Sequence, residues 1–499
     1  MSEQLAPIVA NYLAKEQSIQ NEGQPVAEKL PLPTIDQMPE EIQDIAMEIA
    51  EVSGNWNPVE IYTADSESVA QEKEKVFGAF DKGEEYNPSL TYSYANSLDF
   101  STSRQTLKEL MHKLRSTGQK SKPDDKERMG ELSLERGPRL FRAALYFKLK
   151  DDLATCDLVD GIKARDEGKI ATALKMKYAG TDESLVALAE DVFQRMTIEK
   201  PIDESEGKGL LTLEQKKFIK DMRFDAMGIK DAFEWALNEY GILRTDDNPR
   251  GYKVKIDKNA TSIDVRDKSI EGATVFVPED REMDGKTLLE LIAHEIERHA
   301  VSSVNGWEMF RVGGGQLKID EEAQYEGLGL RGESDLNKNL FGIEDSGPLP
   351  YYTLAVKKAE EGSSFFEIFK DQVDRRLRVA LKKPLGTELP ADIDKKTMDA
   401  AKRTAWLSTY RVMRGHTDMT NSKSFAMAKD IGYLRGYQID QQFKERGLGY
   451  LNETAVIASG AMQLLAEVDI SEDKLPIKFK DVATKYCLEV LLPQMEQAA

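Results

Sequence analysis

Residues 285–304, GKTLLELIAHEIERHAVSSV, decide how the rest of the chain is interpreted. The stretch has strong helix formers and no Pro or Gly after Gly285, so it predicts a helix over about 285–304. It contains the string HEIERH, in which His294 and Glu295 are followed by His299, and the whole chain has only 4 histidines. Two of those four on one helix, with an acid beside the first, indicate a candidate metal centre.

The two histidines of this string are five residues apart, whereas two helical zinc ligands are usually four residues apart. A spacing of four places both rings about 40° apart on one face of an ideal helix, and a spacing of five separates them by about 140°. Joint binding of one metal ion therefore requires a π-bulge or another distortion near residues 296–298. The alternative is a pair of surface histidines on a charged helix.

A third ligand is available a short distance downstream, where IDEEAQYEGLGL at 319–330 supplies Glu321, Glu322 and Glu326. One of these carboxylates would complete a His, His, Glu site with an open position for water. A metal there lowers the pKa of its bound water, and Glu295 is placed to accept the proton. The alternative for the acidic cluster is a solvated helix face.

The segment before the helix predicts a sheet. YKVKID, TSIDVRD and ATVFVPE are three short β-rich runs, which we expect to pair as a small antiparallel sheet at about 251–280. In the remaining sequence from about residue 86, the apolar residues have mostly helical spacing. The predicted class is therefore α+β, mostly helical. Residues 1–85 mix polar and Pro-containing stretches and predict an N-terminal extension, partly disordered or weakly helical, ahead of a catalytic domain at 86–499.

Composition excludes several partners. The chain has 88 acidic and 68 basic residues and a net charge of −20, which argues against nucleic acid and membrane surfaces as partners. Its two cysteines, Cys156 and Cys487, form no disulfide framework, and the N-terminus lacks a secretory signal. The apolar segment at 454–466 is shorter than the roughly 20 residues that cross a bilayer and predicts a buried helix. We expect a cytoplasmic protein.

Several separated elements resemble one metallopeptidase family, which includes the microtubule-associated tyrosine carboxypeptidase and the bacterial proteins named for a QEGLA motif in flavohaemoglobin expression. In that family a HExxxH helix precedes an "EEGLA" or "QEGLA" string, matched here by residues 294–299, then Asn305 and Gly306, then residues 325–329. Later RGxTD and KDxxYLxG elements are matched at 414–418 and 429–436, and Asn87 with Pro88 is a weaker match. The resemblance runs from about residue 86 to the C-terminal region.

The resemblance implies a zincin-like metallopeptidase. It assigns one divalent ion, zinc, to His294, His299 and Glu326, with Glu322 the second choice for the third ligand, and the role of catalytic base to Glu295. The chain departs from the family in three places, one of which is a segment before Lys429 that is about two residues longer. Glu297 and Arg298 stand where Gly-Thr is common before the second histidine, and Gly329 replaces the final Ala of the acidic string.

The resemblance also brings a later element towards the cleft, with the candidate substrate-binding residues Arg414, His416, Lys429 and Tyr433. Cationic groups facing a metal would suit a substrate carboxylate, and His416 or a tyrosine could stabilise an oxyanion. Each residue has a structural alternative. Arg414 and Asp418 could form an internal ion pair, Tyr433 could belong to the core, and His416 could lie on a surface loop.

The expected function is that of a metallopeptidase, carboxypeptidase-like, whose substrate is the C-terminus of a peptide or protein. One alternative is a metal-dependent hydrolase of a non-peptide amide. Another is a catalytically idle helical scaffold or regulator. The sequence leaves the oligomeric state open.

Overall fold

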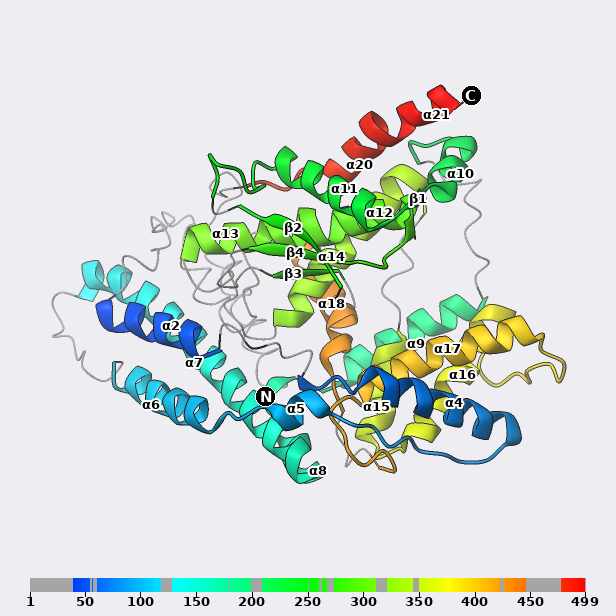
Figure 1. Ribbon diagram of the computed structural model, residues 1–499, viewed down its shortest axis with the longest axis horizontal. Coiled ribbons are helices and arrows are strands. Elements are labelled where there is room, and N and C mark those ends of the chain that lie inside the picture. The colour runs from blue at the N-terminus through cyan, green and yellow to red at the C-terminus, as the bar shows by residue number, and fades with distance from the viewer. Residues whose placement is uncertain are drawn as a thin grey trace, which may run out of the picture.

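In the computed structural model the chain is mostly helical with two small sheets, which confirms the α+β class (Figure 1). The structure describes residues 39–53, 56, 61–117, 128–178, 180–198, 209–249, 251–258, 260, 263–266, 273–310, 321–343, 350–421, 426–445 and 477–498. The apolar segment at 454–466, predicted as a buried helix, lies outside these residues.

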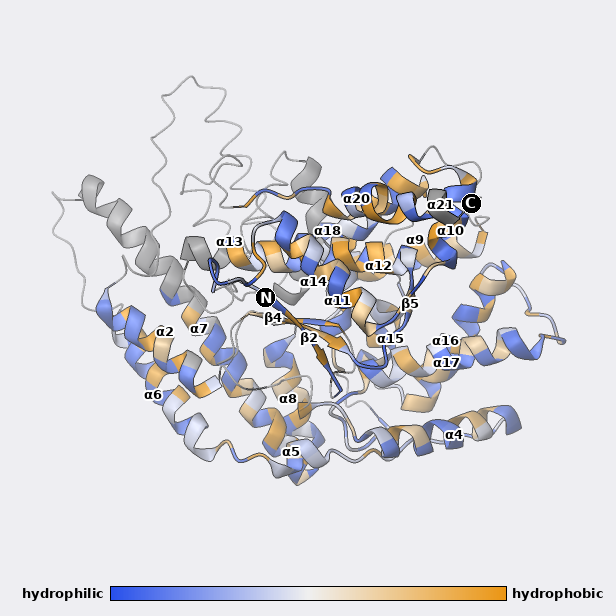
Figure 2. Cartoon of the chain, turned by 45° about the horizontal axis from the view of Figure 1, so that its top comes forward, coloured by the Kyte–Doolittle hydropathy of each residue, from blue (hydrophilic) through white to orange (hydrophobic). Residues whose placement is uncertain are grey.

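The three predicted strands form one sheet in the order β2-β4-β3, with the bounds β2 (Lys253–Asp257), β3 (Asp264–Arg266) and β4 (Thr274–Pro278). Strand β3 pairs antiparallel with β4, as expected, but β2 pairs parallel with β4, so the sheet is mixed. Burial explains the order. All five residues of β4 are buried and it takes the central place, whereas Val254 is the one buried residue of β2. Figure 2 shows hydrophobic residues along this sheet.

The predicted helix over 285–304 is present as three consecutive segments, α12 (Gly285–Leu291), the π-helix η2 (Ile292–Ala300) and α13 (Val301–Phe310). The side chain of Asp284 caps its start by accepting a hydrogen bond from the Thr287 N–H at 2.9 Å. A two-stranded antiparallel pair, β1 (Arg223–Phe224) with β5 (Met283–Asp284), leads directly into α12. The three-stranded sheet lies alongside this helix (Figure 1).

The sheet and the π-helix share one hydrophobic core with further helices: α10 (Leu213–Asp221), α11 (Ala226–Glu239), η4 (Asn337–Phe341), α20 (Val482–Tyr486) and η8 (Cys487–Leu491). The short helix α21 (Leu492–Ala498) follows η8 at the C-terminal end. This core therefore surrounds the helix that carries the HEIERH string.

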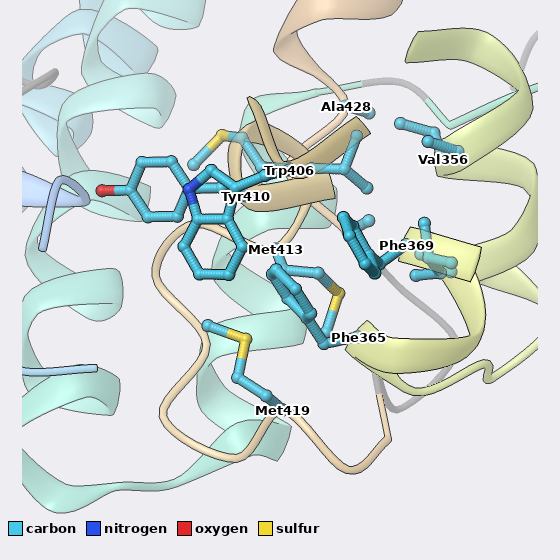
Figure 3. Close-up of a cluster of buried hydrophobic side chains, with 14 of the residues drawn as sticks. Val356, Phe365, Phe369, Trp406, Tyr410, Met413, Met419 and Ala428 are labelled. Atoms are coloured by element: carbon cyan, nitrogen blue, oxygen red, sulfur yellow. The ribbon is translucent and has the colours of Figure 1, made fainter. Parts of the chain in front are cut away.

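A second core is built mainly from helices and the loops that join them. Its helices include α4 (Ser66–Lys82), α5 (Ser93–Ser97), α8 (Glu167–Lys177), α9 (Glu183–Ile198), α15 (Tyr351–Glu360), α16 (Phe365–Leu381), α17 (Lys395–Val412) and the 3-10 helix η5 (Lys429–Ile431). Figure 3 shows its centre, where Trp406 of α17 lies 5.1 Å from Phe365 of α16 between ring centroids. A third, smaller core joins α2 (Glu40–Ser53), α6 (Ser101–Thr117) and α7 (Arg128–Ala164).

The predicted N-terminal extension contains two helices, α2 and α4, within residues 40–82. Helix α2 buries Ile42, Ile45 and Ile49 in the third core, and α4 buries Val76 and Ala79 in the second. Each helix has apolar residues spaced for one buried face, and each finds a neighbour to cover that face. Residues 1–38 lie outside the described part of the chain.

Two helices connect the first core to the second. Helix α14 (Glu321–Leu336) packs against η2 and also against α18 (Gly432–Glu445). The two helices α14 and α18 cross very closely at Gly327. A Cβ atom at this position would overlap the backbone of Gly436. The QEGLA-like and KDxxYLxG elements therefore meet through two glycines.

The two cysteines do not provide reactive thiols. Cys156 and Cys487 are both free and buried, and burial raises the pKa of each thiol to about 12. Among the helices that the structure describes, none combines the length and the apolar character needed to cross a membrane.

Candidate metal centre

The histidines of the HEIERH string lie together because the helix changes period where they stand. Residues Ile292–Ala300 form a π-helix, and the N–H of Val301 bonds to the carbonyl of Ile296, five residues earlier. Residues five apart are therefore one turn apart. The ring centroids of His294 and His299 are 4.6 Å apart, with the ring planes at 88°. The distortion that a five-residue spacing requires is thus present over residues 296–298.

Both imidazoles are buried, with 7 % of His294 and 3 % of His299 exposed. Nδ1 of His294 lies 2.6 Å from Oε1 of Glu333, which belongs to α14. A carboxylate can only accept in this contact, so Nδ1 carries the hydrogen and Nε2 keeps its lone pair. This is the tautomer that presents Nε2 to a metal ion, and carboxylates commonly hold metal-binding histidines in this way.

Glu333 was not among the residues predicted for the site. Its signal in the sequence is helical spacing, since positions 322, 326, 329 and 333 recur at intervals of four, three and four along α14. Such a row forms one stripe on a helix. Glu333 is the member of that stripe that reaches His294 in the described structure.

The third predicted ligand falls on side chains that the structure leaves undescribed. Glu322 and Glu326 lie in α14, where the structure describes their backbone but not their side chains. Within the described residues, no group of three or more His, Cys, Asp and Glu side chains is placed to hold a metal ion. The described centre thus consists of two imidazoles and the carboxylate behind the first.

The two acids inside the string have different surroundings. Glu295, next to His294, is only partly buried. Glu297 is 3 % exposed and accepts a hydrogen bond from the Ala483 N–H at 2.5 Å. Burial raises the pKa of Glu297 to about 8, although the charge of Arg298 and the Ala483 N–H act in the opposite direction. Through the Ala483 N–H, Glu297 therefore binds the C-terminal segment at residues 477–483.

The side chain of Arg298 also makes its contacts away from the histidines. Its guanidinium lies over the ring of Phe479 at 4.3 Å, and its Nη2 is 3.6 Å from Oδ2 of Asp335. Arg298 and Phe479 line a cavity of about 190 Å³ between η2, α14 and the C-terminal segment. The side chains of Glu297 and Arg298 thus contact residue 335 and residues within 479–483.

The C-terminal segment, residues 477–483, is held by further hydrogen bonds to α13 and to the end of α11. The side-chain amide of Asn305 donates to the Ile477 carbonyl and accepts from the Ile477 N–H, both at 2.8 Å. The hydroxyl of Tyr240 donates to the Lys480 carbonyl at 2.6 Å and accepts from the Lys480 N–H at 2.9 Å. Asn305, which resembles a family element, therefore has a structural role here.

The predicted substrate-binding role of His416 does not fit its position and is corrected. His416 is fully buried, and its Nδ1 lies 2.7 Å from Oε2 of Glu167. The other oxygen of Glu167 accepts from the N–H groups of Thr417 and Asp418 at 2.7 and 2.9 Å. The loop wraps around one buried carboxylate, and Gly415, at φ +82°, makes the turn. His416 is therefore a structural residue, although not a surface one.

Two of the other three candidate substrate-binding residues lie on elements that contact α14. Tyr433 begins α18 and stacks on Tyr352, with ring centroids 6.5 Å apart. Lys429 begins η5, which itself contacts α14. Arg414 lies over the ring of Tyr410 at 5.3 Å, and no ion pair joins it to Asp418 among the described residues. The structure thus brings Tyr433 and Lys429 to the α14 side.

Arg411, near Arg414 in the sequence, forms an ion pair with Asp430. Arg411 donates to Oδ1 of Asp430 at 2.6 Å and to the hydroxyl of Tyr352 at 3.1 Å. Burial lowers the pKa of the Arg411 guanidinium, but the charge of Asp430 outweighs burial and raises it above its ordinary value. Arg411 therefore stays charged and holds η5 against α15.

No protein-family model and no curated protein matches this chain. The assignment of a function therefore depends on the site itself.

Proposed function

We propose that the chain is a zincin-like metallopeptidase, and that η2 carries its metal ligands and its catalytic base. The observation that supports this most is the π-helix over Ile292–Ala300. A π-helix is rare, and π segments occur frequently at functional sites. Here it brings together two imidazoles that an α-helix would hold about 140° apart.

His294 and His299 would hold the ion, with the carboxylate of Glu326 as the third ligand. Position 326 is one turn before Gly329 on α14, and Gly329 and Glu333 both adjoin His294. By helical spacing, position 326 belongs to the same stripe as 329 and 333. Two imidazoles and one carboxylate are the donor set of many catalytic zinc sites, so zinc is the ion we expect.

A bound ion of this kind lowers the pKa of its coordinated water and polarises a carbonyl group. Glu295 accepts a proton from the attacking water and returns it to the nitrogen of the leaving amine. Its partial exposure suits this exchange, because the carboxylate can meet solvent and substrate. Glu333 keeps the proton of His294 on Nδ1 throughout.

We further propose a carboxypeptidase-like activity in the cytoplasm on the C-terminus of a peptide or protein. Arg414 supports this, because its guanidinium lies on Tyr410 and forms no carboxylate ion pair within the described residues. A guanidinium in that state can bind a substrate carboxylate with two parallel hydrogen bonds. The two buried free thiols agree with a reducing compartment.

The test is elemental analysis of the purified protein beside two variants. We expect about one divalent ion per chain in the wild type and in His112→Ala, and far less in His294→Ala. His112 is the matched control, because it is an exposed histidine on α6. Equal metal in all three proteins would overturn the proposed site. Metal at the site without cleavage of any peptide in a broad library would instead favour a non-peptide amide substrate.

A further inference from the structure

The face of α14 that meets the π-helix is formed by glycine backbone at the point of contact with His294. A Cβ atom built at Gly329 would lie 2.5 Å from both Cε1 and Nε2 of His294 and 2.7 Å from Cδ2. These distances are well inside van der Waals contact. The imidazole therefore occupies the space that any side chain at position 329 would need.

A second glycine one turn later has a similar role. A Cβ atom at Gly332 would lie 2.7 Å from the carbonyl oxygen of Ala293 and 2.9 Å from Cγ of Arg298. Glycine is unfavourable inside a helix, so glycines at both contact points have a stability cost that an alanine would avoid. The close approach of η2 to α14 is what these glycines permit.

We infer that Gly329 is a positioning residue that sets where the His294 ring lies. The ring has little freedom to retreat, because Glu333 holds Nδ1 at 2.6 Å and the residue is 7 % exposed. On the side that faces α14, the ring lies against the backbone of Gly329 rather than against a flexible side chain. An added methyl group must therefore displace the ring, break the Glu333 contact or push the two helices apart.

This inference concerns a position where the chain departs from the string it resembles, in which alanine is usual. Glycine at 329 allows the ring to lie directly against α14. The geometric part of the inference does not depend on metal binding, whereas its consequence for the ion rests on the proposed function. Two experiments separate these parts.

The first experiment is a double-mutant cycle on the metal-free protein, with the melting temperature as the readout. Gly329→Ala should lower the melting temperature by roughly 2 °C or more when His294 is present. In the His294→Ala background the obstacle is gone, so the same substitution should be neutral or raise the melting temperature, since Ala favours helix. If Gly329→Ala folds only in the His294→Ala background, the conclusion is the same. An equal shift in both backgrounds would overturn the inference.

The second experiment measures metal binding rather than turnover. Co²⁺ and Zn²⁺ titrations of Gly329→Ala should show affinity weakened by about tenfold or more, with a changed Co²⁺ absorption spectrum. Gly78→Ala on α4 is the matched control, because a Cβ atom there meets nothing within 4 Å. Unchanged affinity and spectrum would overturn the role of Gly329 at the metal. If the wild type binds no metal, the proposed function fails, and the first experiment alone decides the inference.

Discussion

Oε1 of Glu333 lies 2.6 Å from Nδ1 of His294, in a contact that joins α14 to the π-helix. The two residues are 39 positions apart in the chain, and their contact fixes both the tautomer and the orientation of the imidazole. It also makes position 333 sensitive to any change in how α14 packs on η2. A carboxylate behind a metal-binding histidine increases the basicity of the ring, so this pair should matter for the strength of metal binding.

Glu333→Gln should therefore weaken zinc binding by about 10- to 100-fold without unfolding the chain. The amide keeps the size of the side chain but removes the charge that favours the Nδ1–H tautomer. Zinc affinity is measured by competition with a chelator of known strength. Glu290→Gln is the control, because that carboxylate accepts from Asn337 of η4 at 2.8 Å instead. Equal zinc affinity in Glu333→Gln and the wild type would remove the role given to Glu333.

Glu295→Gln should retain the metal and the fold but lose turnover by about 10²- to 10⁴-fold, because it removes the proton acceptor and no ligand. Glu297→Gln is the matched control, since this neighbouring acid binds the Ala483 N–H instead. Peptide turnover, metal content and the melting temperature are measured for both variants. Turnover in Glu295→Gln close to that of the wild type would place the base elsewhere.

The sequence predicted the helix and the need for its distortion, because both follow from local information. Helix formers over 285–304 and the spacing of His294 and His299 are visible in the string itself. The π-helix is the geometry that satisfies that spacing. The α+β class followed in the same way from the change of apolar period before residue 285.

The parts that sequence reasoning missed depend on contacts between distant segments. The parallel pairing of β2 reflects which strand is buried most, and burial depends on what covers the sheet. The contacts of Glu333 with His294 and of Ala483 with Glu297 join residues 39 and 186 positions apart. His416 reads as a loop residue in sequence, and only the fold places Glu167 beside it.

The buried Glu167 predicts an acid-sensitive contribution to stability. Burial alone would raise its pKa, but His416, Thr417 and the Asp418 N–H outweigh burial and hold the pKa at about 2, below the ordinary value of 4.5. A depressed pKa stabilises the folded state above the unfolded value, and the contribution is lost as the pH falls from 4.5 towards 2. The shift corresponds to about 3 kcal/mol at neutral pH.

Glu167→Gln should therefore lower the free energy of unfolding at pH 7 by about 3 kcal/mol, and its difference from the wild type should narrow as the pH falls below 4.5. Urea unfolding at a series of pH values measures this. Glu74→Gln on α4 is the control, because that carboxylate is exposed. A difference that stays constant from pH 7 to pH 3.5 would show that the charge of Glu167 is not the cause.

The glycine contact between α14 and α18 predicts a further stability effect. Gly327→Ala should destabilise the protein by about 1–3 kcal/mol, because the added methyl group meets the backbone of Gly436 rather than a movable side chain. Gly78→Ala should have the opposite sign, by up to ~1 kcal/mol, since space is open there and Ala favours helix. Chemical unfolding compares the two. Two alanines with the same stabilising effect would mean that the crossing tolerates a side chain.

The last prediction concerns how a substrate C-terminus is held. If Arg414 binds the terminal carboxylate through a planar pair of hydrogen bonds, Arg414→Lys should weaken cleavage of peptides with a free C-terminus, because an ammonium cannot form that pair. Its metal content should not change, since Arg414 is not a proposed ligand. Mass spectrometry of matched peptides with free and amidated C-termini measures the effect. Lys402→Arg on α17, at an ion pair with Asp81 of α4, is the control for exchanging one basic residue for another at a different position. Equal cleavage of free and amidated peptides, or cleavage at internal bonds, would exclude carboxylate capture. In that case Lys429 and Tyr433 would be the candidates for contacts along the substrate chain, because these residues lie on the elements that pack against α14.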